Sequence, residues 1–163
     1  IPLMYHNLME NDKLKWTNLD DKSIHYSDQY GHFVANTREK YFALAHALYL
    51  DKDYDRAKAV IKRSLEHIPD GPFYYDMYNF YMASAVLFPI GKDNNDSEAS
   101  ELALSIIDTM AERCVEVKEY ENLHGDNKPQ YSRDFYIYRS LGKSIKDFYS
   151  KNGMTDKSDK FGL

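Results

Sequence analysis

Residues 38–69, REKYFALAHALYLDKDYDRAKAVIKRSLEHIP, decide the fold of this chain. Two apolar stripes run through the segment, each with the spacing of one face of a helix. The first consists of Tyr41, Leu44, Ala45 and Leu48, and the second of Ala57, Ile61, Ser64 and Leu65. Residues 51–55 between them are polar and long enough only for a tight turn. The pattern predicts two antiparallel helices.

The ends of the second helix are marked by specific residues. Asp53 or Asp55 can accept hydrogen bonds from its first N–H groups. Pro69 ends it, because a proline ring cannot continue the hydrogen-bond ladder. Ala45 and Ala57 are predicted to have a structural role, since small side chains let the two helices approach closely.

The same residues resemble a tetratricopeptide repeat, a helix–turn–helix unit of about 34 residues. Tyr41 stands in place of the usual Trp, and Leu44 and Ala45 match the Leu and the small residue after it. Ala57 matches the close-packing Ala of the second helix, and Pro69 matches the closing Pro. An ordinary helical hairpin remains the alternative, because periodicity alone does not separate the two.

Composition narrows the class of protein. The 163 residues suffice for one domain with a substantial core. The net charge of −5 argues against a nucleic-acid partner. No apolar run approaches the ~18 residues of a membrane span, so direct membrane insertion is not expected. The chain begins with Ile1 and carries no signal peptide, which suggests a piece of a longer protein.

The sequence predicts an all-α chain in three parts. Residues 1–32 form an irregular segment packed on the body, with Trp16 and Tyr26 as its structural anchors. Residues 33–151 form a tetratricopeptide-like α-α superhelix of about five helices. Residues 152–163 form a polar, frayed tail.

Three helices are predicted after the hairpin. The first begins near residue 73 and ends at Pro89 and Gly91, followed by the polar loop 92–97, KDNNDS. The second covers about residues 98–120 and the third about 132–150, with a polar connection at 119–130. The distance from Ala57 to Ala99 is 42 residues, eight more than the usual repeat of 34, so the second repeat is degenerate.

The helix after residue 73 is rich in tyrosine and has two interpretations. It is either a buried inner helix of a stack or a wall of hydroxyl groups along a ligand groove. In the second case the candidate binding residues are Tyr41, Leu48, Tyr75, Tyr78 and Met82.

No catalytic residue, metal site or cofactor is predicted. The sequence has no HExxH motif, no paired cysteines and no glycine-rich phosphate loop. The six histidines are scattered, and Cys114 falls on a helix stripe as a small core residue.

A wider resemblance rests on three groups of residues between about 14 and 149. The first group is Trp16, Asn18, Asp21, Tyr26 and Asp28. The hairpin group is Arg38, Phe42, Leu44, Ala45, Asp55, Ala57, Val60 and Pro69. The third group is Pro72 with Tyr75 and Asp76. In this order they are similar to the C-terminal region of large bacterial multi-spanning membrane proteins, a domain-of-unknown-function family regarded as protein O-mannosyltransferase-like glycosyltransferases.

That resemblance implies a non-catalytic accessory domain at the periplasmic face of the membrane, with no transferase residue among the matching positions. Trp16 and Asp21 are then expected to have a structural role, holding the irregular segment on the hairpin. We expect an interaction scaffold whose partner is a peptide or protein segment, including the membrane part of its own parent chain. The alternatives are a glycan-binding accessory domain that stacks tyrosine rings on sugars and an independent enzyme, for which a pair of facing carboxylates would be needed.

Overall fold

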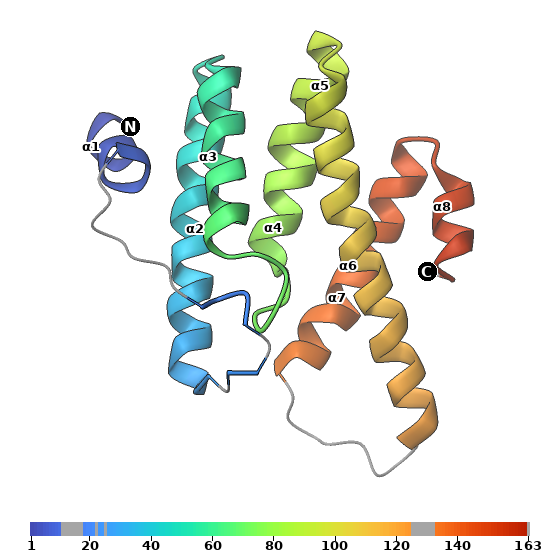
Figure 1. The fold of residues 1–163 in the computed structure, drawn as a ribbon. Coiled ribbons are helices and arrows are strands. Elements are labelled where there is room, and N and C mark those ends of the chain that lie inside the picture. Colours follow the sequence, from blue (N-terminus) through green and yellow to red (C-terminus); the bar gives the residue numbers. More distant parts are fainter. Residues whose placement is uncertain (11–17, 22, 25, 125–132, 163) are drawn as a thin grey trace. The chain divides into compact units, whose positions relative to one another are not determined.

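The structure, a computed structural model, describes residues 1–10, 18–21, 23–24, 26–124 and 133–162. All regular elements in these residues are helical, which confirms the all-α prediction. The chain divides into two compact units, Ile1–Leu104 and Ser105–Leu163. Figure 1 shows the helices of both units.

Unit 1 contains most of the helices. They are α1 (Pro2–Tyr5), the π-helix η1 (His6–Glu10), α2 (Asp28–Leu50), α3 (Tyr54–His67), α4 (Met77–Tyr81), the π-helix η2 (Met82–Leu87), α5 (Phe88–Asn94) and the first part of α6 (Ser97–His124). Helix α2 packs on α3 and also on α4 and η2 (Figure 1). It is therefore the central helix of this unit.

The α2–α3 hairpin forms as the sequence predicts. Ala45 and Ala57 are both completely buried, so the two small side chains lie inside the core. Asp53 is the N-cap of α3, where its carboxylate accepts a hydrogen bond from the Arg56 N–H at 3.3 Å. Lys52 adopts a left-handed φ of +62° in the turn. The helix ends at His67, two residues before Pro69.

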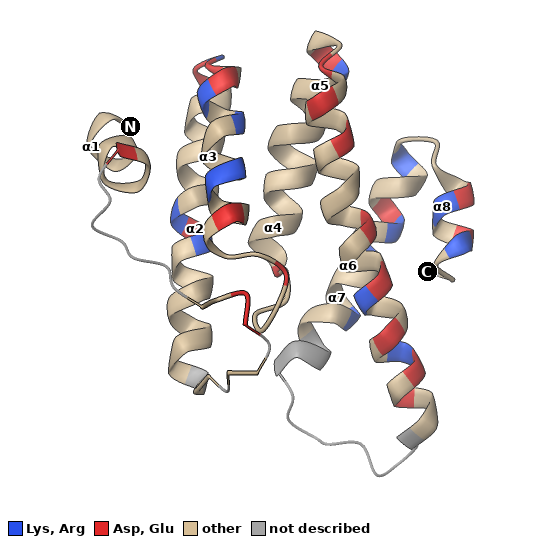
Figure 2. Ribbon diagram, viewed as in Figure 1, with Lys and Arg blue, Asp and Glu red and all other residues tan. Residues whose placement is uncertain are grey.

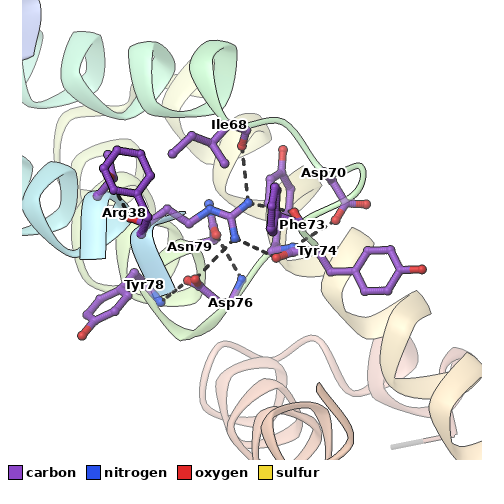
Figure 3. Close-up of polar contacts among 11 residues, drawn as sticks. Arg38, Ile68, Asp70, Phe73, Tyr74, Asp76, Tyr78 and Asn79 are labelled. Carbon is purple, nitrogen blue, oxygen red and sulfur yellow. Dashed lines mark hydrogen bonds and ion pairs between the residues drawn. The ribbon is translucent and has the colours of Figure 1, made fainter. Parts of the chain in front are cut away.

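A buried arginine fastens the connection between α3 and α4 to α2 (Figure 3). The Arg38 side chain comes from α2 and is 1% exposed. Its guanidinium donates to the carbonyl oxygens of Tyr74 at 2.7 Å and Phe73 at 2.9 Å, and lies 3.3 Å from the Asp76 carboxylate. Because a buried charge is tolerated only when it is paired and hydrogen-bonded, these acceptors determine where the connection lies.

Asp76 also begins α4 through a reciprocal cap. Its carboxylate accepts from the Tyr78 N–H at 2.9 Å, and the Asn79 side chain accepts from the Asp76 N–H at 3.0 Å. The start of α4 is therefore coupled to Arg38 through one carboxylate.

Pro89 does not end a helix, contrary to the sequence-based prediction. Helices α4, η2 and α5 follow one another without a break from Met77 to Asn94. Proline normally clashes with the carbonyl four residues earlier. Here the preceding turn is a π-helix, in which the Phe88 N–H reaches back five residues to Ala83, and this wider pairing makes room for the ring.

The turn into α6 is correspondingly shorter than the predicted loop 92–97. Asn95 ends α5 in the left-handed conformation, with φ +53°. The Asp96 carboxylate then accepts from the Ala99 N–H at 3.0 Å in the first turn of α6. Gly91 lies against this turn, and an added Cβ would stand 2.1 Å from Ser100 Oγ and 2.7 Å from Ser100 N.

The N-terminal segment differs from its prediction in two respects. Helix α2 begins at Asp28, so residues 28–32 are helical rather than irregular. Asp21 does not reach the hairpin, because its carboxylate accepts from the N–H and hydroxyl of Ser23 at 2.9 and 2.6 Å. Tyr26 is the anchor, with its ring 4.8 Å from that of Phe73. Trp16 lies outside the described residues.

Unit 2 contains the rest of α6, α7 (Arg133–Lys151) and α8 (Thr155–Lys160). One face of α7 is apolar and buried, with the side chains of Tyr138, Leu141, Ile145 and Phe148. On α6 the side chains of Ile106, Ile107, Met110, Ala111 and Cys114 are buried, and the Cys114 thiol donates to the Tyr138 carbonyl of α7 at 3.4 Å.

The C-terminal tail is ordered rather than frayed. Residues 155–160 form α8, and Phe161 is 8% exposed, with its ring 6.3 Å from that of Tyr149. Lys157 of α8 pairs with the Asp108 carboxylate at 2.5 Å, and the Tyr149 hydroxyl donates to the same carboxylate at 2.7 Å. The sequence signal for the packing of this tail was Phe161, an aromatic residue among mostly polar neighbours.

Arg38→Met is expected to lower the free energy of unfolding by about 3–5 kcal/mol, because Asp76 and two buried carbonyls lose their donor. Urea denaturation followed by circular dichroism measures the change. The matched control is Lys40→Met on the same helix, where the lysine side chain is 58% exposed. A loss below about 1 kcal/mol for Arg38→Met would contradict the role given to this arginine.

Gly91→Ala is expected to destabilise unit 1 by about 1–3 kcal/mol, because its Cβ would collide with backbone as well as side-chain atoms of Ser100. Gly31→Ala is the control, since nothing lies within 4 Å of a Cβ at that helical position. That change should stabilise the protein by up to about 1 kcal/mol. Equal melting temperatures for the two variants would contradict the close approach of α5 and α6.

Candidate functional site

A row of aromatic side chains covers part of unit 1. We call it the aromatic face; its members are Phe42, His46, Tyr49, Tyr54, Tyr78 and Tyr81. Neighbouring ring centroids along the row are 5.6 Å apart for Tyr81 and Phe42 and 5.5 Å for Phe42 and His46. The row continues with 6.4 Å from His46 to Tyr49 and 5.9 Å from Tyr49 to Tyr54.

Helix geometry explains how α2 supplies the centre of this row. Phe42, His46 and Tyr49 repeat at i, i+4 and i+7, so they share one face of the helix. The buried stripe of Tyr41, Ala45 and Leu48 precedes them by one residue at each step. The aromatic stripe therefore lies about 100° around the helix from the core stripe, and its members are partly exposed.

Helix α4 adds Tyr78 and Tyr81 to the row, because α4 packs beside α2. Tyr81 is 39% exposed, and of these two rings it lies nearer to that of Phe42, at 5.6 Å compared with 6.4 Å for Tyr78. The cap at Asp76 fixes the position of Tyr78 in the first turn of α4 (Figure 3). Burial raises the pKa of the Tyr78 hydroxyl, and the carboxylates of Glu39 and Asp76 raise it further. The hydroxyl is therefore a neutral donor at physiological pH.

The row ends at an acidic cavity. A cavity of about 440 Å³ lies where the α2–α3 turn meets the end of α5, and Tyr54 belongs to both the row and the cavity wall. Its lining residues are Asp51, Lys52, Asp53, Tyr54, Asp55, Ile90, Asn94 and Asp96. Four carboxylates and one ammonium group therefore surround it, and acidic groups are visible at the α2–α3 turn and near the start of α6 in Figure 2.

Two of these carboxylates are hydrogen-bonded to cationic partners, and a third forms a longer ion pair. Asp53 accepts from Arg56 Nε at 2.6 Å, and this hydrogen bond lowers the pKa of Asp53. Asp96 is paired with Lys58, whose hydrogen bond lowers the pKa of Asp96. Asp55 is 99% exposed and its carboxylate lies 3.6 Å from Lys58 Nζ. Asp51 and Asp55 are therefore the carboxylates most available to a ligand.

The structure separates the five predicted binding residues. Tyr41, Leu48 and Met82 are at most 1% exposed, so the prediction that they line an open groove is wrong in this structure. Tyr41 and Leu48 belong to the core stripe of α2, and Met82 lies in η2, which packs on α2. Tyr75 is partly buried, and its ring faces the Arg38 guanidinium at 5.9 Å. Only Tyr78 lies on the aromatic face.

The other five members of that face were not among the predicted binding residues. The i, i+4, i+7 spacing of Phe42, His46 and Tyr49 was present beside the core stripe and was the available signal. Tyr54 and Tyr81 gave no such signal, because their contribution depends on how other helices pack against α2.

Among the described residues, no group of three or more His, Cys, Asp or Glu side chains is arranged to hold a metal ion. None of the helices in this described part of the chain is both long and apolar enough to cross a bilayer. No family model matches the chain, and comparisons with curated proteins and with solved structures give no match.

The burial of Tyr41 has a consequence at high pH. Burial raises the pKa of Tyr41 to about 12 from the ordinary value of 10.0, and its hydroxyl lies 2.9 Å from His67 Nδ1. The unfolded chain therefore loses this proton first. The stabilising contribution is complete below pH 10 and is lost as the pH rises toward 12, at up to about 1.4 kcal/mol per pH unit.

Tyr41→Phe removes this titrating group. The difference in free energy of unfolding between the original protein and Tyr41→Phe should be constant from about pH 7 to 9. It should then shift in favour of the phenylalanine variant between pH 10 and 12. Urea titrations at each pH measure it. A difference that stays constant up to pH 12 would contradict the placement of this hydroxyl.

Proposed function

We propose that unit 1 is a non-catalytic interaction module that binds an extended peptide segment along the aromatic face, with a Lys or Arg side chain of the peptide in the acidic cavity. The observation that carries this proposal is the continuity of the two features. A row of partly exposed rings leads from Tyr81 through Phe42 to Tyr54, and Tyr54 also lines a cavity with four carboxylates.

The spacing of the rings supports an extended ligand. Consecutive centroids from Tyr81 to Tyr54 are 5.5 to 6.4 Å apart. Alternate side chains of an extended chain are about 6–7 Å apart, because each residue advances about 3.3 Å. Successive rings can therefore contact every second side chain of the ligand. The row of five rings accommodates about eight or nine ligand residues.

The chemistry of the face favours apolar or proline-containing residues. Aromatic rings bury apolar surface, and tyrosine adds a hydroxyl for hydrogen bonds to the ligand backbone. Recognition of proline-rich segments in aromatic-lined grooves uses this combination, because the ligand is already extended and loses little entropy on binding. Partly exposed rings gathered in one place are also typical of interaction sites.

The cavity determines the direction in which the ligand binds. Asp53 and Asp96 are hydrogen-bonded to Arg56 and Lys58. Asp51, together with the exposed Asp55, which has only a 3.6 Å ion pair with Lys58, is therefore the carboxylate most accessible to a cation of the ligand. Lys52 on the rim repels a cationic side chain, but the four carboxylates outnumber it and leave the cavity acidic. A basic residue of the peptide is therefore expected at the Tyr54 end of the row.

We further propose that the helices of unit 1 stack as in a tetratricopeptide protein, with α2 and α4 as the inner helices that carry the ligand. The burial of Ala45 and Ala57 and the packing of α4 on α2 support this arrangement. The accompanying proposal of an accessory domain in a membrane glycosyltransferase-like protein rests on the motif resemblance alone. Under it, the peptide segment belongs to the parent chain.

The test uses an array of extended nonapeptides rich in proline and leucine, with either Arg or Glu at one end. We expect the Arg series to bind. Phe42→Ala and Tyr81→Ala should each weaken binding about tenfold or more, as for truncated aromatic anchors. Tyr120→Ala is the matched control, because this tyrosine is 38% exposed and lies in unit 2. Fluorescence anisotropy measures the dissociation constants.

Asp51→Asn with Asp55→Asn tests the cavity separately. This double variant should bind the Arg and Glu series equally while its melting temperature is unchanged. Equal binding of both series by the original protein would contradict the assignment of the cavity. If the protein instead binds a glycan array and no peptide, the glycan-binding alternative replaces the peptide proposal. Binding to neither array would contradict the aromatic face as a binding surface.

A further inference from the structure

A second cavity, of about 330 Å³, lies within unit 2. Helix α6 contributes Cys114, Val117, Lys118 and Glu121, helix α7 contributes Tyr138, Arg139, Gly142, Lys143 and Lys146, and Gly162 follows α8. A cavity of this volume is at the small end of the range for ligand pockets, so it suits a small molecule rather than a polymer.

The walls of the cavity are basic although the chain as a whole is acidic. Four of the lining residues carry a positive charge and one, Glu121, carries a negative charge. The full chain has a net charge of −5. The charge around this cavity is therefore positive, opposite in sign to the net charge of the chain.

The cations are arranged on one face of α7. Arg139, Lys143 and Lys146 repeat at i, i+4 and i+7, and none of them forms an ion pair among the residues that the structure describes. Like charges at this spacing destabilise a helix by about 0.2–0.5 kcal/mol per pair. Across the cavity, Lys118 Nζ donates to the Gly162 carbonyl at 2.8 Å, which keeps that ammonium group at the wall. An anion in the cavity would relieve this repulsion.

The floor of the cavity is apolar and uncharged. Cys114 is 6% exposed, and its thiol donates to the Tyr138 carbonyl at 3.4 Å. Burial raises the pKa of the Cys114 thiol to about 12, so no thiolate repels an anion. Tyr138 is 3% exposed. The cavity thus combines a cationic rim with a floor that can contact a hydrocarbon or aromatic group.

We propose that this cavity binds a small organic anion, a carboxylate, phosphate ester or sulfonate that carries an apolar body. The anionic group lies among Arg139, Lys143 and Lys146, and the apolar body lies against Val117 and Cys114. Arginine supplies planar paired donors for such a group, and the lysines supply mobile point charges. The proposal is independent of the peptide site in unit 1, because it rests on other residues.

The probe for the test is anilinonaphthalene sulfonate, an organic anion whose fluorescence rises in apolar surroundings. Its uncharged counterpart, N-phenylnaphthylamine, has the same ring system without the sulfonate. We expect saturable binding of the sulfonate to the full chain. The uncharged compound should bind at least about tenfold more weakly, because it lacks a charge-assisted hydrogen bond, and a factor of ten corresponds to about 1.4 kcal/mol. Added salt should weaken the binding of the sulfonate and leave the binding of the uncharged compound unchanged.

Arg139→Gln with Lys143→Gln tests the residues. This double variant should raise the dissociation constant of the sulfonate by about tenfold or more. The matched control is Lys92→Gln with Lys151→Gln, which removes the same charge from exposed positions elsewhere and should leave binding within about twofold. Melting temperatures of all variants show whether each is folded.

A third measurement locates the probe. Amide resonances of Gly142 and Gly162, which line the cavity, should shift on titration with the sulfonate, whereas those of Gly31 and Gly71 in unit 1 should not. Equal affinity of both double variants, equal binding of the uncharged compound, or shifts confined to unit 1 would each overturn the proposal.

Discussion

The structure of unit 1 depends on the burial of one positive charge. Arg38 is 1% exposed, and its guanidinium reaches acceptors on three consecutive parts of the chain: the Ile68 carbonyl at 3.5 Å, the loop carbonyls of Phe73 and Tyr74, and the Asp76 carboxylate. Moving a guanidinium out of water costs several kcal/mol unless these acceptors are in place. The connection between α3 and α4 is therefore held to one geometry, although it has no regular secondary structure.

This constraint extends to the surface. Asp76 both faces Arg38 and begins α4, so the buried charge fixes where Tyr78 and Tyr81 lie relative to Phe42 of α2. The rows of rings on two helices join only because α4 starts at this point. A binding surface on these rings is therefore positioned from inside the core, by a residue that does not itself reach the surface.

The two cavities differ in chemistry because of the helices that form them. The first is surrounded by the short side chains of a tight turn and a helix start, where Asp residues accept backbone N–H groups, and this is why carboxylates collect there. The second lies along two long helices, where the solvent-facing positions of α7 carry Arg139, Lys143 and Lys146 above an apolar floor. Local helix chemistry therefore accounts for the opposite charges of the two cavities.

The sequence by itself determined the helices and the α2–α3 hairpin, because apolar spacing and the small residues Ala45 and Ala57 act locally. It did not determine which aromatic residues are exposed. Tyr41 and Phe42 are adjacent and both aromatic, and about 100° of rotation separates their stripes. Only the packing of α3, α4 and η2 on α2 buries the first stripe and leaves the second at the surface. Contacts between separate helices also decided that Phe161 docks against Tyr149.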